Sequence, residues 1–212
     1  METRKRSGKG VVLGLLALLF LGAAAQGELI TIAIEAVVNI AEDDGNYLEG
    51  KVNVGDVITG YYTYDLSTPD SYPTDDNRGR YEHSQSPCGI FLSVEGIDFQ
   101  TDLSDIDFIV IANNNYNSRD SYIVVSDNNT SSNGTSPDFI VWNLKDYTET
   151  ALQDDSLPTT APVLSQWNSF NHLRIEADRK YRIDATVTSA VLIPEPMTVI
   201  LFGLGGLFIK RR

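Results

Sequence analysis

The chain has 212 residues, enough for one domain or at most two, and its 16 Lys and Arg stand against 29 Asp and Glu. The formal net charge is −13, and residues 10–193 are more acidic still, with nine basic and twenty-seven acidic side chains, a charge of −18. A surface of that sign repels phosphates, so we expect no nucleic-acid partner.

The N-terminus predicts a secretory signal peptide over residues 1–25. Residues 4–9 hold four cations, residues 11–21 are an eleven-residue apolar run, and the three alanines at 23–25 suit a signal-peptidase cut before Gln26. At about 1.5 Å per residue this run is too short to cross about 30 Å of hydrocarbon. A permanent membrane anchor is therefore the less favoured alternative, and we expect the protein to be exported.

Strand patterns fill the middle of the chain. Ile30, Ile32, Ile34, Ala36, Val38 and Ile40 share one parity, and a period of two predicts a half-buried strand. Further runs rich in β-branched and aromatic residues predict strands within 54–65, 89–99, 104–112, 121–126, 138–146, 172–178 and 180–193. Clusters of Asn, Asp, Ser, Gly and Pro separate them. Residues 163–173 could hold one helical turn.

This pattern predicts an all-β fold of eight or nine short strands. Two half-apolar sheets must cover each other, which favours a single antiparallel β-sandwich, jelly-roll-like or immunoglobulin-like, over residues 26–193. We expect an N-terminal signal helix before it and a short transmembrane helix after it.

Two acidic turns are candidate calcium sites, because calcium prefers carboxylate and loop carbonyl ligands. The candidates are Asp43, Asp44, Asn46 and Glu49 in the first turn, and Asp75, Asp76 and Asn77 in the second. Neither follows the twelve-residue EF-hand spacing, and turn chemistry alone also explains Asp, Asn and Gly there. No other cofactor is expected.

Four tyrosines are candidates for binding a glycan, since aromatic faces stack on sugar rings. They are Tyr61, Tyr62, Tyr64 and Tyr72, near a long polar loop. The alternative is that they are half-buried strand residues that only pack.

Catalytic motifs are missing from the sequence. His83 and His172 are the two histidines and form no HExxH pair, and no G-x-S-x-G elbow occurs. A role for the lone Cys88 as a nucleophile has no support in its spacing from either histidine; a small buried side chain or an intermolecular bridge are the alternatives. We therefore expect a protein that is not an enzyme.

The last residues form a three-part tail over residues 194–212. Pro194, Glu195 and Pro196 keep the chain extended, residues 197–209 are thirteen mostly apolar residues, and Lys210, Arg211 and Arg212 stay cytoplasmic under the positive-inside rule. The tail resembles the PEP-CTERM protein-sorting domain of Gram-negative bacteria that secrete exopolysaccharide. The resemblance implies that an integral-membrane exosortase recognises the tail and cuts near Pro-Glu-Pro.

These expectations combine into one hypothesis. The protein is exported, held transiently at the inner membrane by its C-terminal helix, and then placed at the cell surface or outside the cell. It serves there as a non-enzymatic component of an exopolysaccharide or biofilm matrix, with signal peptidase, exosortase and exopolysaccharide as partners. The alternatives are a carbohydrate-binding or calcium-dependent adhesion module and a β-sandwich glycan hydrolase.

Overall fold

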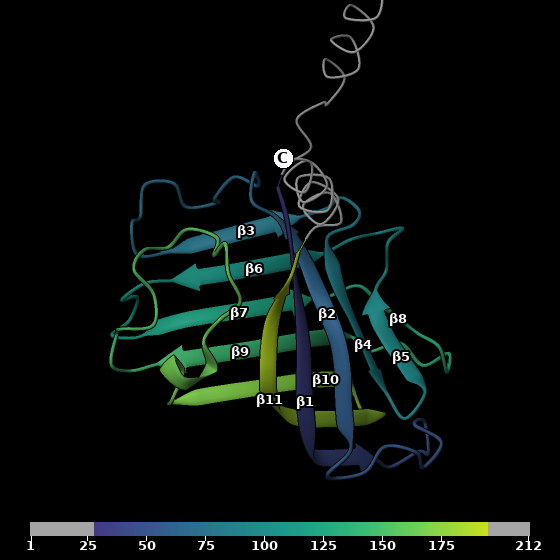
Figure 1. Ribbon diagram of the computed structural model, residues 1–212. Coiled ribbons are helices and arrows are strands. Elements are labelled where there is room, and N and C mark those ends of the chain that lie inside the picture. Colours follow the sequence, from purple (N-terminus) through teal and green to yellow (C-terminus); the bar gives the residue numbers. More distant parts are fainter. Residues whose placement is uncertain (1–27, 195–212) are drawn as a thin grey trace, which may run out of the picture.

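The computed structural model describes residues 28–194, which form one antiparallel sheet of eleven strands (Figure 1). The strands are β1 (Leu29–Asp43), β2 (Val57–Asp65), β3 (Gly79–His83), β4 (Gly89–Val94), β5 (Ile97–Thr101), β6 (Phe108–Asn113), β7 (Asp120–Ser126), β8 (Asn129–Ser131), β9 (Phe139–Asp146), β10 (Phe170–Ala177) and β11 (Tyr181–Ile193). The predicted helical turn is confirmed as a 3-10 helix, η1 (Leu164–Gln166). The all-β prediction is likewise confirmed.

The strand order is β3-β6-β7-β9-β10-β11-β1-β2-β4-β5-β8, without a break. The expected pair of separate sheets is therefore wrong: the two layers are parts of one sheet that curls over itself. Figure 1 shows β3, β6, β7, β9 and β10 crossing behind β11, β1 and β2. The expected signal helix and C-terminal helix lie outside the described residues.

Two register shifts in the β1–β11 pair, the first with its extra residue on β11 and the second on β1, explain how the sheet curls. Glu35 pairs with Ser189 while Ala36 pairs with Val187, and Val38 pairs with Ala185 while Ile40 pairs with Asp184. Bulges of this kind bend a strand and increase its twist. They let the long β1–β11 pair pass from one layer of the sheet to the other.

The same shifts correct the predicted inward face. The alternation from Ile30 to Val38 is confirmed, with each predicted residue at most 5% exposed. Ile40 lies after the second shift and is 36% exposed, so its predicted inward position is wrong. Val191 and Ile193 share the parity of the buried Ile183 in the sequence, but they are 57% and 43% exposed. The extra residue of β11 between Val187 and Ser189 reverses the parity there and places them on the outer face, opposite Ala33 and Thr31.

Aromatic side chains from both layers meet in the core. Trp142 on β9 is completely buried, and its ring centroid lies 5.9 Å from that of Tyr62 on β2. The Tyr62 and Tyr122 hydroxyls are 3.0 Å apart, which satisfies two buried polar groups. These contacts hold the crossing layers together, and burying side chains of this size is a major favourable term in folding.

Candidate functional site

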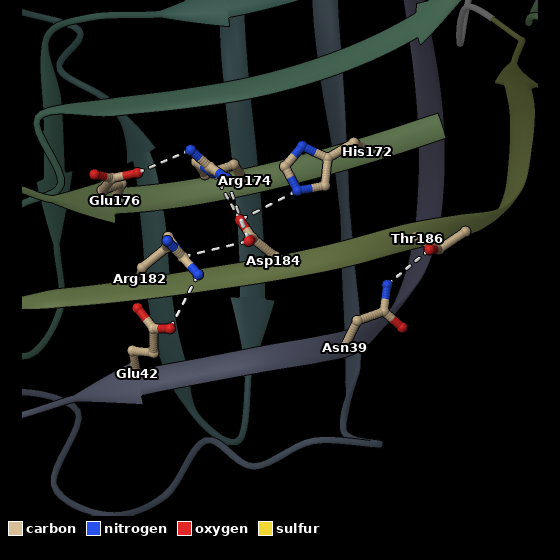
Figure 2. Close-up of polar contacts among 8 residues, drawn as sticks. All are labelled: Asn39, Glu42, His172, Arg174, Glu176, Arg182, Asp184 and Thr186. Carbon is tan, nitrogen blue, oxygen red and sulfur yellow. Dashed lines mark hydrogen bonds and ion pairs between the residues drawn. The ribbon is translucent and has the colours of Figure 1, made fainter. Parts of the chain in front are cut away.

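Five charged side chains and one histidine from β1, β10 and β11 form one group on the outer face of the sheet (Figure 2), which we call the Asp184 network: Glu42, His172, Arg174, Glu176, Arg182 and Asp184. Asp184 lies at its centre and is only 4% exposed. Arg174 donates from Nε to Asp184 Oδ1 at 2.7 Å and from Nη2 to Oδ2 at 3.3 Å. His172 Nε2 lies 3.2 Å from the same Oδ1.

Strand alternation and register assemble this network. On β10, Arg174 and Glu176 point outward while their neighbours fill the core. The β10–β11 register sets Arg174 opposite Asp184 and Glu176 opposite Arg182, and the β1–β11 register sets Glu42 opposite Arg182. Opposite charges directly across an antiparallel pair stabilise the sheet.

The charges in the network are already engaged with one another. Arg182 Nη2 donates to Glu42 Oε1 at 3.0 Å, and its Nε lies 3.3 Å from Asp184 Oδ2 in an ion pair without hydrogen-bond geometry. The hydrogen bond to Asp184 raises the pKa of Arg174 above its ordinary value, although partial burial opposes the shift. Side chains whose charges are neutralised by partners on the neighbouring strand hold the strands together and are poorly placed to transfer protons.

A separate cleft of about 400 Å³ is lined mostly by the loop that joins β9 to η1. Tyr122 and Trp167 contribute to its wall, together with Leu157, Pro158 and Gln166. Both aromatic rings are almost wholly buried, at 1% and 4% exposure. The Tyr64 hydroxyl donates to the Pro158 carbonyl at 2.6 Å, which attaches this loop to the core.

His83 and Cys88 line another cleft, of about 350 Å³. Burial lowers the pKa of His83 to about 4, against a smaller opposing effect from Asp65, so the imidazole is neutral at pH 7. Its Nδ1 lies 2.9 Å from Thr68 Oγ1. Burial raises the pKa of Cys88 to about 11. A thiol that stays protonated is a poor nucleophile, and the buried Cys88 is a free cysteine.

The calcium candidates are turn residues in the structure. Asp43 accepts backbone N–H bonds from Tyr47 at 2.6 Å and Leu48 at 2.8 Å, and Asp75 accepts one from Asn77 at 3.3 Å. Across residues 28–194, no group of three His, Cys, Asp or Glu side chains is arranged to hold a metal ion.

The remaining calcium candidates also lie in these turns. Asn46 and Glu49 adopt positive φ angles of 57° and 58°, Glu49 pairs with Lys51, and Asp44 and Asp76 are exposed. Calcium binding stays a prediction, and the expected result of binding is a melting temperature that EDTA lowers and calcium restores.

The four candidate glycan tyrosines do not form one surface. Tyr62 and Tyr64 are 0% exposed and belong to the core, so their ring faces cannot receive a sugar. Tyr61 is 44% exposed and stacks on Phe91, with ring centroids 5.6 Å apart. Tyr72 is half-buried under the Arg78 guanidinium, 3.6 Å from its ring centroid. Glycan binding through Tyr61 or Tyr72 stays a prediction.

Of the sorting motif, the structure describes only the exposed Pro194. Glu195, Pro196, the apolar run at 197–209 and the cations Lys210, Arg211 and Arg212 lie outside the described residues, as does the signal peptide at 1–25. Within residues 28–194 no helix has the length and apolar character needed to cross a membrane.

Sequence reasoning missed the Asp184 network, although a signal was present. Four of the nine cations of residues 10–193 fall within residues 174–182, and Arg174 and Arg182 are each followed two residues later by an acidic residue, the spacing of one strand face. Comparison with known proteins adds no assignment: no family model, no curated protein and no solved structure matches the chain.

Proposed function

We propose that this is an exported surface or matrix protein delivered by a PEP-CTERM-type sorting tail. Signal peptidase removes residues 1–25, and the tail at residues 194–212 holds the acidic β domain at the outer side of the inner membrane. An exosortase then cuts near Pro194, Glu195 and Pro196. The released domain becomes a non-enzymatic component of an exopolysaccharide layer.

One observation carries the proposal: both ends of the domain emerge side by side. β1 begins at Leu29 and β11 ends at Ile193, and these strands are hydrogen-bonded neighbours with Thr31 paired to Ile193. Figure 1 places the two strand ends together at one end of the sheet. Because both termini lie at the same end of the domain, the same end faces the membrane whichever terminus holds it there. This arrangement suits a chain that is exported by an N-terminal signal and then retained at the membrane by a C-terminal tail.

Two further features support a role outside the cell. A domain charge of −18 keeps copies apart and hydrated in a crowded matrix, and it favours cations or basic partners over anionic lipid. Described carboxylates accept bonds from backbone amides or arginines, as Asp43 and Asp184 do. Such groups serve the stability and solubility of the fold, which is what a structural component requires.

The test replaces Pro194, Glu195 and Pro196 together by Ala, Gln and Ala in the full chain, expressed in the native host. The proposal expects the native protein in the medium or on the surface, and the variant retained in the membrane fraction with its tail. Pro69→Ala, at an exposed proline of a loop, is the control and should be released normally. Equal release of the triple variant and the native protein would contradict the proposal.

A further inference from the structure

The last part of β11 is paired on one side only. β11 pairs with β1 all the way to Ile193, whereas its pairing with β10 ends at Ala185. The Asn171 side chain still reaches the Val187 carbonyl at 2.7 Å. Among residues 28–194, no strand hydrogen-bonds to the other edge of residues 188–193, which we call the β11 edge.

The β11 edge is free of charge, and its last three residues are apolar and exposed. Val191, Leu192 and Ile193 are 57%, 37% and 43% exposed, so both faces of this strand end are accessible. No charged residue occurs between Ala185 and Pro194, although the domain carries −18. An exposed apolar strand edge is a template for pairing with another strand.

The outermost strands of the sheet are protected in ways that natural proteins use against such pairing. Beside β3, Asp70 forms a bridge with Tyr81, and Ser71 N–H donates to the Arg80 carbonyl at 2.8 Å. β8 has three residues, all polar: Asn129, Thr130 and Ser131. The β11 edge carries no charge, and no strand among residues 28–194 pairs with it.

We propose that the β11 edge pairs antiparallel with the same edge of a second copy of this chain. Charge argues for this occupant: two copies of a strongly acidic domain repel each other elsewhere, and here they meet without like charges facing each other. A strand placed antiparallel to itself about a two-fold axis is self-complementary, with position 189 opposite 193 and Val191 opposite its own copy. Main-chain hydrogen bonds would provide the affinity.

The sorting tail would control this pairing, a consequence that rests on the proposed function. While tails hold two copies in one membrane, both β11 strands run toward that membrane and are parallel to each other. Antiparallel pairing requires one copy to turn over, which becomes possible only after the tail is cut. Release from the membrane would thus permit self-association.

The experiment uses the full chain in lipid nanodiscs, with a site for an added protease inserted after Pro194. Val191→Cys supplies a thiol at the centre of the β11 edge, and Val57→Cys, at a valine of similar exposure (51%), is the matched control. Native Cys88 is buried. After the cut, oxidation should link Val191→Cys copies into dimers and leave Val57→Cys copies monomeric; equal linkage of both variants would overturn the proposal.

Light scattering of the cut protein supplies the second measurement. The contact is small, so we expect a weak dimer that strengthens with salt, because salt screens the repulsion between acidic copies. Leu192→Lys should weaken association at least about tenfold, or about 1.4 kcal/mol, while Val57→Lys should not change it. A protein that stays monomeric at about 1 mM, where binding would be worth at most about 4 kcal/mol, would refute the pairing. A chain that nanodiscs fail to retain before the cut would instead contradict the proposed anchor.

Discussion

Replacing Asp184 by asparagine tests whether the Asp184 network stabilises the curled sheet. The substitution keeps the size of the side chain and removes its charge, which leaves Arg174 and Arg182 without the carboxylate that both contact. Asp184 now accepts hydrogen bonds from Arg174 at 2.7 and 3.3 Å and is only 4% exposed. His172 and Arg182 contact the same carboxylate at 3.2 and 3.3 Å.

The structure sets the magnitude of the effect. Breaking a buried ion pair costs about 3–5 kcal/mol of unfolding free energy, and a hydrogen bond to a charged group is worth about 1.5–3 kcal/mol. Both arginine side chains are 32% exposed, so water partly solvates their charges after the substitution. We therefore expect Asp184→Asn to cost about 2–3 kcal/mol, or roughly 5–10 °C in melting temperature for a domain of this size.

The assay is thermal and urea unfolding followed by circular dichroism, with Asp178→Asn as the matched control. Asp178 is 78% exposed, and its ion partner Arg179 is 90% exposed, so the control should change stability by less than about 0.5 kcal/mol. A melting temperature for Asp184→Asn within about 1 °C of the control would refute the reasoning, because a difference so small corresponds to about 0.5 kcal/mol or less.

Three further predictions concern the core. Tyr62→Phe should lower the free energy of unfolding by about 1–2 kcal/mol, because the Tyr122 hydroxyl loses its 3.0 Å partner. In urea unfolding, the double Tyr62→Phe, Tyr122→Phe variant should lose less stability than the sum of the two single changes. Strictly additive losses would count against this hydrogen bond. Gly60→Ala should cost about 3 kcal/mol, because its Cβ would lie 2.0 Å from a backbone carbonyl oxygen of β4; an unchanged urea midpoint would show that the strands move apart freely. The pKa of His83 is about 4 in the folded protein, below its ordinary 6.5, so the unfolded chain binds more protons between these values and stability should fall as pH drops from about 6.5 to about 4. His83→Phe should make stability depend less on pH in this range. An equally steep loss of stability in the variant would show that other groups cause the pH dependence.

Strand alternation in the sequence predicted most of the core. Ile140, Trp142 and Leu144 face inward as their parity indicates, and each is 0% exposed. The exposed positions of Ile40 and Val191 could not be predicted in the same way, because parity changes wherever a bulge adds a residue and a bulge depends on the partner strand. The choice between one curled sheet and two separate sheets likewise depends on pairings between residues far apart in the chain.

The candidate sites show the same division between local and long-range information. Asp43 and Asp75 look like ligands in the sequence, but Asp and Asn are also what turns require, and the turn use is the one seen. Tyr62 and Tyr64 lie two residues apart, so the sequence places them on the same face of a strand. Which face of that strand is buried depends on the layer of the sheet that packs against it. The charges of the last two strands were visible, whereas the burial of Asp184 follows only from the β10–β11 register.

The most direct test of the account is the intact mass of the protein recovered outside the native cells. We expect a chain that begins at Gln26 and ends close to Pro194–Pro196, without residues 197–212. Recovery of an external chain that still ends at Arg212 would contradict it.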